Sequence, residues 1–362
     1  MEIKLDDLII WLNNLYLDAY QIDIVLNNFE DIEFFFSKEA ETVIKKLLPK
    51  NVTTKIIENR DVSKIKDLVS QVKDKYNIIT CESEEFPSLL KLIEGSPKLL
   101  YYKGDISLLN NELLAVVGAR KITTYGKWAC EKLIREISNY PISIASGLAI
   151  GTDTVAHKAA IDNGLKTVGV LGTGIDLIYP QRNRALFEEM EANHLIITEF
   201  RPGTPGYKTN FPMRNRIISG ISKAALIIEA KRRSGSLITA RNAFEQGREV
   251  FAVPGNINSI LSEGTNDLIK DSANPATEGR DIIEGVESFR KLKDKSDSVS
   301  IDIDGLSDDE RKIYEILKEG PSSIDIISFR TGMAVTEINP ILTILEIKGC
   351  IKEIAASNFS II

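Results

Sequence analysis

Six short runs of apolar, mostly β-branched residues alternate with longer segments across the middle of this 362-residue chain. The intervening segments have the length and apolar spacing of helices that connect parallel strands. Strands that alternate with helices in this way predict an open α/β fold, Rossmann-like and doubly wound, with a mainly parallel sheet. The expected strands are residues 113–117, 142–145, 167–171, 195–198, 225–229 and 250–253; the expected helices are 125–138, 152–163, 182–192, 213–221 and 236–246.

The flanks of this core differ from it in pattern. Residues 5–28 and 37–48 have helical spacing, interrupted at 29–36 and at Pro49, and an extended pair at 77–80 and 98–102 is expected at an edge of the sheet. Beyond the core, a charged, sign-alternating stretch precedes three expected helices and a terminal hairpin, the pattern of a winged helix. We therefore predict a small helical domain of the SAM or helix-hairpin-helix kind at residues 1–75, a Rossmann-like domain at 76–290, a linker at 291–304 and a winged-helix domain at 305–362.

Composition excludes several classes of protein. The two histidines and three scattered cysteines have no spacing of a zinc site or a disulfide framework, so we expect neither a metal nor another cofactor. Apolar runs reach only five or six residues, far short of the roughly 20 that span a bilayer. The start of the chain lacks the basic residues of a signal peptide, and we expect a cytoplasmic protein with no membrane contact.

The charge is unevenly distributed along the chain. Residues 1–110 carry 14 basic and 19 acidic side chains, residues 111–290 carry 22 and 20, and the remainder carries 9 and 13. Within the middle segment, residues 201–241 hold nine lysines and arginines against one acid, Glu229. This concentration predicts an anionic partner for the α/β domain.

Four junctions that follow expected strands are rich in glycine or polar residues. Ligands of open α/β sheets bind where the strands end, and glycine lets backbone N–H groups approach an anion there. We therefore predict a phosphate ligand, although each glycine taken singly is also explained by a tight turn. The junctions are residues 118–121 (GARK), 146–153 (SGLAIGTD), 172–176 (GTGID) and 231–239 (KRRSGSLIT).

The familiar nucleotide motifs are absent from these junctions. No Gly-Lys is followed by Ser or Thr, as a phosphate-binding loop of ATPases requires, since Trp128 follows Gly126-Lys127. Gly118 and Gly126 are too far apart for a dinucleotide fingerprint, and no acid follows the second strand to bind a ribose. A motor, a kinase and a NAD-dependent enzyme are therefore disfavoured.

Residues 211–218 (FPMRNRII) favour single-stranded nucleic acid. An aromatic ring beside two arginines, with Lys208 just before them, can stack on a base while the cations bind phosphates. The alternative is that Phe211 packs into the core and that Arg214 and Arg216 are ordinary surface charges.

Six segments together resemble the bacterial DNA-processing protein A (DprA, also called Smf) family, in order and in spacing. The resemblance runs from about Phe86 to Ile282 and extends more loosely to the winged helix. It implies a protein that is not an enzyme, that binds and protects single-stranded DNA, that dimerises through the Rossmann-like domain, and that loads the RecA recombinase during natural transformation. The segments are VGARKITTYG at 117–126, SGLAIGTDTVAHKAAI at 146–161, GTGIDLIYPQRN at 172–183, TEFRPG at 198–203, NFPMRNRIISGIS at 210–222 and SGSLITARNAFEQGREVFAVPG at 234–255.

The resemblance also implies particular DNA contacts. To the residues carried over by position we add three from the anion-site interpretation of the fourth junction. Asn215 is expected to position the backbone. The residues implied by the family are Arg120, Ser146, Gly147, Lys208, Phe211, Arg214 and Arg216; the three added are Ser234, Gly235 and Ser236.

The chain departs from the family pattern at three places. The first turn reads Gly-Ala-Arg where Gly-Ser-Arg is frequent, which removes one hydroxyl donor worth about 1 kcal/mol at most. The segment GTNDLIKDSA brings Asp267 and Asp271, which would weaken DNA binding if it lay near the strand. The N-terminal helices lack a Gly-x-Gly hairpin, so we expect a scaffold or partner-docking role for them.

Two other functions compete with DNA processing. The fold also resembles nucleoside-monophosphate phosphoribohydrolases of the lysine-decarboxylase-like group, but Thr239 stands where their catalytic glutamate would be. His157, one helical turn after Asp153, invites a catalytic interpretation, but a histidine with satisfied hydrogen bonds that orients the phosphate loop or supports packing is favoured. A transcription factor acting through the winged helix is disfavoured because its expected recognition helix, residues 335–348, carries two glutamates, one lysine and Pro340.

Overall fold

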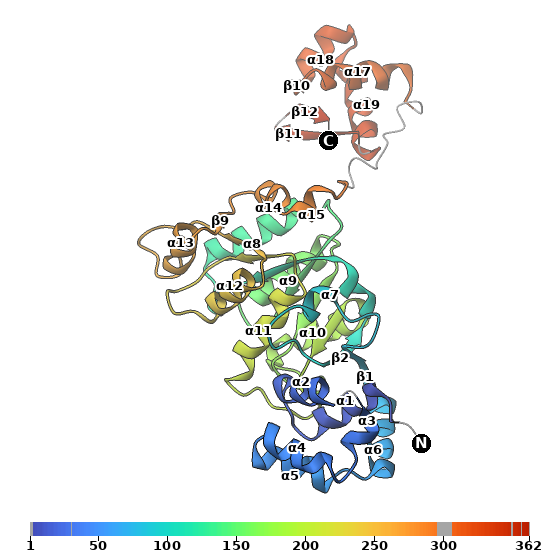
Figure 1. Cartoon of the computed structure of the whole chain (residues 1–362). Helices are drawn as coiled ribbons and strands as arrows, with labels where there is room; N and C mark the ends of the chain where they lie inside the picture. Colours follow the sequence, from blue (N-terminus) through green and yellow to red (C-terminus); the bar gives the residue numbers. More distant parts are fainter. Residues whose placement is uncertain (1–2, 30, 295–305, 349, 356, 362) are drawn as a thin grey trace. The chain divides into compact units, whose positions relative to one another are not determined.

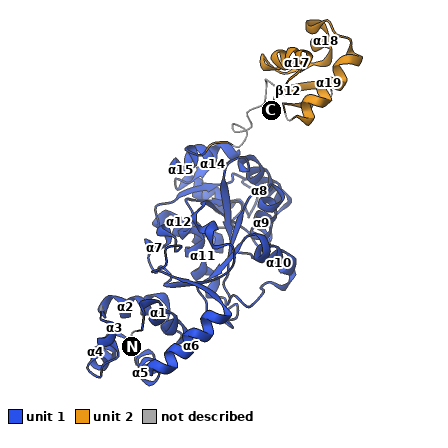
Figure 2. Ribbon diagram, turned by 90° about the vertical axis from the view of Figure 1, so that its right-hand side faces the viewer, with its two compact units in different colours: residues 1–292 blue, residues 293–362 orange. Residues whose placement is uncertain are grey.

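The computed structural model describes residues 3–29, 31–294, 306–348, 350–355 and 357–361. The chain divides into two compact units, residues 1–292 and 293–362, and each is described by itself (Figure 2). Most of the predicted linker, residues 295–304, lies outside the described residues. No helix in the described part is both long enough and apolar enough to span a membrane.

All six strands predicted in the middle of the chain are present in one nine-stranded sheet (Figure 1). The sheet order is β1-β2-β6-β5-β4-β3-β7-β8-β9, and every pairing from β6 to β9 is parallel. The extended pair is also confirmed, because β1 and β2 form an antiparallel hairpin that adds to β6 at one edge. The strands are β1 Asn77–Thr80, β2 Leu99–Gly104, β3 Glu112–Val117, β4 Ile142–Ser146, β5 Thr167–Val170, β6 Leu195–Thr198, β7 Ala224–Ile227, β8 Glu249–Ala252 and β9 Asn274–Pro275.

Helices cover both faces of this sheet, which is the doubly wound arrangement predicted. Alternate residues of β3 divide between two apolar layers: Leu113, Ala115 and Val117 pack with α11 and α12, whereas Leu114 and Val116 pack with α8 and α9. The strands are buried on both faces, which explains their continuous apolar runs. The helices of this unit are α7 Ser88–Lys91, α8 Thr124–Ile137, α9 Thr152–Asp162, α10 Arg184–Asn193, α11 Asn210–Gly220, α12 Gly235–Glu245, α13 Glu263–Lys270, α14 Gly279–Gly285 and α15 Glu287–Arg290, with 3-10 turns η1 Ile106–Asn110 and η2 Gln181–Asn183.

The direction of the chain across the sheet reverses between β3 and β7. From β3 the chain adds β4, β5 and β6 on one side, then returns to place β7 against the other side of β3. The connections that leave β3 and β7 therefore diverge to opposite faces. This reversal opens a crevice at the carboxyl ends of the two strands, where open α/β sheets hold their ligands.

Six helices precede the sheet. They confirm a helical N-terminal region, but residues 5–28 form two helices, and the predicted interruption at 29–36 contains one further helical turn. The helices share an apolar cluster with the sheet edge, where Ile9 packs with Leu99 and Tyr101. The boundary at residues 75 and 76 stays a prediction. The helices are α1 Leu5–Asn14, α2 Ala19–Asn28, α3 Ile32–Phe35, α4 Ala40–Leu47, α5 Lys50–Glu58 and α6 Val62–Lys75.

The second unit has the predicted three helices and hairpin of a winged helix. Its first helix begins with a capping box, in which Ser307 and Glu310 satisfy each other's backbone N–H groups. An apolar core that includes Ile313, Ile338 and Phe359 joins the helices to the wing. The elements are α17 Asp308–Lys318, β10 Ser322–Ser323, α18 Ile324–Thr331, α19 Val335–Ile347, β11 Ile351–Ala355 and β12 Asn358–Ile361.

Candidate nucleic-acid interface

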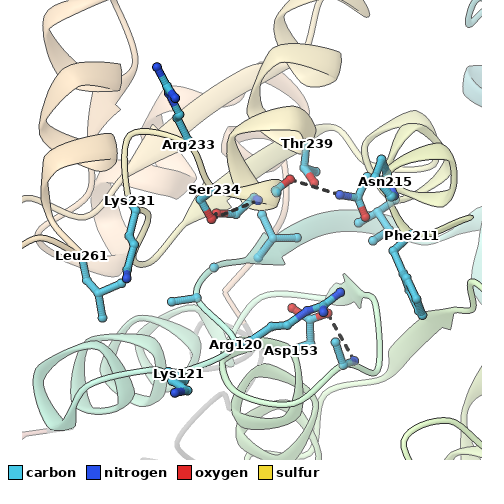
Figure 3. A pocket seen from close by; sticks show the side chains of 18 of the residues that line it. Arg120, Lys121, Asp153, Phe211, Asn215, Lys231, Arg233, Ser234, Thr239 and Leu261 are labelled. Atoms are coloured by element: carbon cyan, nitrogen blue, oxygen red, sulfur yellow. Dashed lines mark hydrogen bonds between the residues drawn. The ribbon is translucent and has the colours of Figure 1, made fainter. Parts of the chain in front are cut away.

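A cavity of about 730 Å³ occupies the crevice at the carboxyl ends of β3 and β7 (Figure 3). Its walls come from the segments after β3, β4, β7 and β8, and from the loop and first turns of α11. These include three of the four glycine-rich or polar junctions singled out from the sequence. The fourth, residues 172–176, borders a smaller hollow of about 70 Å³ that shares Arg120, Ala149 and Phe211 with the main cavity.

The main cavity is strongly cationic. Six basic side chains line it, against a single carboxylate, Asp153. Five of the six are exposed, and none of these five forms an ion pair with a carboxylate among the described residues. Unpaired cations around a concave surface concentrate positive potential and attract anions. The six are Arg120, Lys121, Lys208, Arg214, Lys231 and Arg233.

The first loop is held in place by the start of α9. The backbone N–H and hydroxyl of Thr152 both donate to the carbonyl of Ala119, at 3.1 and 3.2 Å. Gly151 has a φ of 84°, and a Cβ there would lie 2.3 Å from that same carbonyl oxygen, so only glycine allows the two loops to meet. The loop after β3 is thereby fixed and presents the Arg120 side chain to the cavity.

Phe211 lies in the cavity wall with its ring half-buried. The guanidinium carbon of Arg120 lies 5.3 Å from the centre of the ring, and the ring centre of Tyr179 lies 5.5 Å away, with 33° between the two ring planes. The alternative of a fully buried core position is therefore wrong. An aromatic ring flanked by a cation and a second ring is a surface on which a planar base can stack.

Arg214 is placed differently from the surface arginine suggested by the sequence, because its side chain is only 3% exposed. One guanidinium nitrogen donates to the carbonyls of Gly147, at 2.6 Å, and Val170, which joins α11 to the ends of β4 and β5. A Cβ at Gly147 would lie 2.5 Å from the guanidinium nitrogens, which explains the glycine. Arg214 therefore holds the cavity floor together, with one edge in the lining.

Burial shapes the ionisation of Arg214 and of its acidic neighbour Asp153. Desolvation lowers the pKa of Arg214 to about 10, opposed by the attraction of Asp153. Burial likewise raises the pKa of Asp153, opposed by Arg214 and by the N–H of Ala149, which donates to the carboxylate at 3.3 Å. Each charge thus compensates part of the desolvation cost of the other.

Arg216 lies outside both hollows. Its guanidinium forms a bidentate ion pair with Glu199, at 2.7 and 2.6 Å. Ion pairs also neutralise other basic residues of segment 201–241: Lys223 pairs with Glu112, and Arg241 pairs with Glu245. Of its nine cations, only Lys208, Lys231 and Arg233 line the cavity, are exposed and have no ion pair to a described carboxylate.

The start of α12 forms the opposite wall. Ser234 caps the helix by accepting from the N–H of Ser236 at 3.4 Å, and the two hydroxyls lie 2.8 Å apart. Asn215 donates to the carbonyl of Gly235 at 3.3 Å, which confirms the expectation that it positions backbone. The structure thus brings the three added residues together with Arg120, Lys208 and Phe211 around one cavity.

Acidic residue Asp267, noted as a departure from the family, faces Arg232. The carboxylate accepts from Arg232 Nε at 3.1 Å and lies 3.4 Å from the ammonium of Lys270. Neither Asp267 nor Arg232 lines the cavity. Asp267 therefore neutralises Arg232, the residue of the Lys231-Arg232-Arg233 run that does not line the cavity.

Ser146, another predicted contact, lines neither hollow. It is fully buried at the end of β4, and its hydroxyl donates to the carbonyl of Val116 at 2.6 Å, so it ties β4 to β3. The lining residues that sequence reasoning did not select are chiefly Lys121, Lys231, Arg233 and Thr239. Lys121, Lys231 and Arg233 could have been selected from the sequence, because they come directly after the strands β3 and β7.

His157 lies in the core beneath the cavity. It is fully buried, and its Nδ1 lies 2.7 Å from the hydroxyl of Thr167. Desolvation, with smaller contributions from His194 and Arg214, lowers the pKa of His157 to about 3. The imidazole is therefore neutral over the physiological range and packs in the core, but its buried Nε2 has no hydrogen-bond partner among the described residues, so it is not the fully satisfied histidine expected from the sequence.

The fold and the cavity define the class of protein: a Rossmann-like α/β protein with a cationic crevice at its switch point and a winged helix in a second unit. The family model of the DNA recombination-mediator protein A matches residues 77–287, and that of the DprA winged helix domain matches residues 302–355. The chain belongs to the DNA recombination-mediator protein A family, known as DprA or Smf.

Individual relatives agree with this assignment. The chain is 42% identical over 223 residues to the DNA processing protein DprA of Streptococcus pneumoniae, covering 59% of this chain and 78% of the relative. It is 36% identical over 280 residues to the protein Smf of Escherichia coli, covering 76% of this chain and 75% of that protein.

Two solved structures are similar to the fold described above. The X-ray structure of the S. pneumoniae protein superposes with a TM-score of 0.71 at 36% identity, covering 79% of this chain and 99% of that chain. A structure of DNA processing protein A from Helicobacter pylori describes that protein's single-stranded DNA binding mode. It superposes with a TM-score of 0.54 at 28% identity, covering 60% of this chain and 99% of that chain.

Arg214→Ala is expected to lower the free energy of unfolding by about 3 kcal/mol, because it removes the bonds to two strand-end carbonyls and leaves Asp153 buried without its countercharge. Arg120→Ala should change it by less than about 0.5 kcal/mol, since that side chain is exposed. Urea unfolding of both variants and the wild type measures the difference. Equal stability of all three proteins would contradict the structural role of Arg214.

His157 should make the protein less stable in acid. Its pKa is lower in the folded chain than in the unfolded chain, so below pH 6.5 only the unfolded chain takes up this proton, and stability is lost as the pH falls towards 3. The loss attributable to His157 reaches about 5 kcal/mol at most. His157→Asn, whose amide can still meet the Thr167 hydroxyl, should unfold with a shallower pH dependence in urea between pH 7 and 4; an unchanged slope contradicts this account.

Proposed function

We propose that the cavity binds single-stranded DNA, with a base stacked on Phe211 and the flanking phosphates bound by unpaired cations. The observation that supports this most directly is the half-buried Phe211 ring, with the Arg120 guanidinium 5.3 Å from its centre, inside a cavity lined by unpaired lysines and arginines. Stacking accepts any base, and the cations recognise the backbone common to all sequences. The proposed binding is therefore tolerant of sequence.

A single strand suits this geometry better than a duplex. The ring of Phe211 is set into the cavity wall, so a base must leave its stack to reach it. In a duplex that movement breaks pairing and stacking, at a cost of a few kcal/mol, whereas a single strand offers its bases freely. The solved H. pylori relative, with its single-stranded DNA binding mode, supports the same choice.

The predicted contacts divide into two proposed roles. We assign Arg120, Lys208 and Phe211 to direct contact with the strand, because they line the cavity and their charged or aromatic groups are accessible. We assign Ser146, Gly147, Arg214 and Arg216 to positioning. The side chains of Ser146, Arg214 and Arg216 are bonded to other protein groups, and Gly147 leaves the space that the Arg214 guanidinium occupies. Ser234, Gly235 and Ser236 are considered in the next subsection.

The enzyme alternative receives little support from the cavity. Thr239, the residue at the position of the phosphoribohydrolase glutamate, lines the wall. The lining carboxylate, Asp153, accepts from the Ala149 N–H and is held near Arg214, so its oxygens serve the loop and not a substrate. We therefore propose binding without catalysis.

The surface of the winged helix favours protein contact over duplex DNA. Lys348, the one lysine of the expected recognition helix, forms an ion pair with Glu310 at 2.8 Å. The exposed side chains of α18 and α19 include Phe329, 90% exposed, and Ile347, 81% exposed. Apolar groups on this surface fit a protein partner better than they fit phosphates.

The proposed partners are RecA and a second copy of the chain. We propose RecA because the family is described as a recombination mediator, and dimerisation through the Rossmann-like domain is supported by Ile257, which is 97% exposed in the segment between β8 and α13. Sedimentation of the chain at micromolar concentration, alone and with RecA on a single strand, is expected to show a dimer and a joint complex. A monomer contradicts the dimer, and separate boundaries contradict the contact with RecA.

The full chain is expected to bind a labelled single-stranded oligonucleotide more tightly than its duplex, with affinity that falls as salt rises. Arg120→Ala and Lys208→Ala should each weaken binding about tenfold and reduce the salt slope by about one, because each removes a phosphate contact. Phe211→Leu should weaken binding by about 1–3 kcal/mol without changing the slope, because it removes stacking and no charge. Fluorescence anisotropy at two salt concentrations measures all three.

Arg280→Ala is the matched control for these variants. It makes the same change in net charge, but Arg280 is exposed on α14, paired with Glu284, and absent from the cavity lining. Its affinity and salt slope should equal those of the wild type. Tighter binding of duplex than of single strand would instead support the transcription-factor alternative, and no binding of either would sink the proposed function.

A further inference from the structure

The start of α12 and the segment before it present cations and helical N–H groups to the cavity, and the proposed stacking of a base on Phe211 does not use them. The first turn of the helix faces the cavity, and its backbone N–H groups carry the positive end of the helix dipole. Lys231 and Arg233 line the same wall, and neither forms an ion pair with a described carboxylate. Their neighbour Arg232 is paired with Asp267 and lies outside the lining.

Thr239 provides a second and independent sign of a ligand here. It lines the cavity one turn into the helix, it is fully buried, and its hydroxyl has no hydrogen-bond partner among the described residues (Figure 3). A helical threonine commonly donates to the carbonyl four residues earlier. Here that carbonyl belongs to Gly235 and accepts from Asn215 instead. A buried hydroxyl without a partner costs free energy that a bound ligand would recover.

Gly235 leaves room for such a ligand. A Cβ built at this residue would meet no protein atom within 4 Å, so neither packing nor a strained φ requires the glycine. The empty space in front of Gly235 belongs to the cavity that Lys231, Ser236 and Thr239 line. A ligand that approaches the helix end closely accounts for a glycine that the fold itself does not need.

We propose that the start of α12 binds a phosphomonoester of a nucleoside, either the phosphorylated end of a DNA strand or a free mononucleotide. The groups at hand are the N–H groups of the first helical turn, the hydroxyls of Ser234, Ser236 and Thr239, and the cations of Lys231 and Arg233. A terminal phosphate offers three free oxygens and a charge near −2 to these donors, whereas a phosphate within a strand offers two and −1. A terminal phosphate can also enter end-on and reach Thr239, while an internal one is held along the groove by the chain on both sides.

The two sources are distinguished by their position relative to Phe211. The Arg120–Phe211 wall and the α12 wall border one cavity of about 730 Å³, a volume within the range that holds a small ligand such as a mononucleotide. In the strand-end case, which deepens the proposed function, the last base would stack on Phe211 while its phosphate binds α12. In the free-nucleotide case the site would work without a strand.

The test compares oligonucleotides that differ only at their ends. The full-length protein is titrated against one sequence, labelled on an internal base, with a 5′-phosphate, with a 3′-phosphate or with hydroxyls at both ends, and by calorimetry against dTMP and thymidine. We expect the phosphate to strengthen binding about tenfold, which is about 1.4 kcal/mol, in the oligonucleotides or in dTMP. Preference among the oligonucleotides identifies the strand end as the source, and preference for dTMP alone identifies the free nucleotide.

The variants locate the effect. Gly235→Ala fills the space in front of the helix and Thr239→Val removes the hydroxyl at constant shape; each should abolish the preference for phosphate while the fully hydroxylated strand still binds. Arg233→Ala removes a lining cation and should abolish the preference while also weakening the binding of the hydroxylated strand. Arg232→Ala makes the same charge change on the adjacent residue and should retain the preference. Urea unfolding midpoints verify that the variants are folded.

The failure of this inference is separable from failure of the proposed function. If strands bind with salt-sensitive affinity but neither a terminal phosphate nor dTMP is preferred, the phosphomonoester site is overturned and the proposed function stands. If no oligonucleotide binds but dTMP is preferred over thymidine and Gly235→Ala removes the preference, the proposed function fails and the site stands. A preference that survives Gly235→Ala and Thr239→Val also overturns the site.

Discussion

The cavity depends on one buried cation. Arg214 reaches from α11 to the carbonyls that follow β4 and end β5, and its charge is stabilised in the interior by Asp153 at the start of α9. Strand-end carbonyls in an open sheet otherwise face the crevice without partners, and a guanidinium has enough donors to satisfy several of them. The glycine at 147 follows from this arrangement, because the arginine needs the space that a side chain would occupy.

A second constraint is the pairing of charge elsewhere in the α/β unit. Of the arginines and lysines in residues 201–241, Arg216, Lys223, Arg232 and Arg241 each have a carboxylate partner. Those that line the cavity and remain exposed have none. Because an ion pair cancels most of the field of both its charges, the exposed cations without a carboxylate partner give the cavity a positive character even though the whole chain is acidic. A protein of net charge −7 can therefore still present a cationic crevice.

Most of the fold was predictable from the sequence, whereas the roles of individual residues were not. The six central strands, the edge hairpin, the capping box at Ser307 and the winged helix follow from local patterns, since apolar periodicity and caps act within a few residues. The sequence did not predict α3, because four residues are too few to show the apolar spacing of a helix. Arg214 and Arg216 are only two residues apart in one motif, yet one is buried among carbonyls and the other is paired with Glu199 on a different segment.

The sequence by itself determined the class of fold, the order of its elements, the family and the segments that border the cavity, because these depend on short-range patterns and on motif spacing. Only the tertiary structure decided which cations remain free, that Phe211 is accessible in the wall, and that Thr239 is buried without a partner. Those properties depend on partners 17 to 67 residues away, such as Glu199 for Arg216 and Gly147 for Arg214. Charge pairing and desolvation act through space, so no reading of neighbouring residues along the chain can supply them.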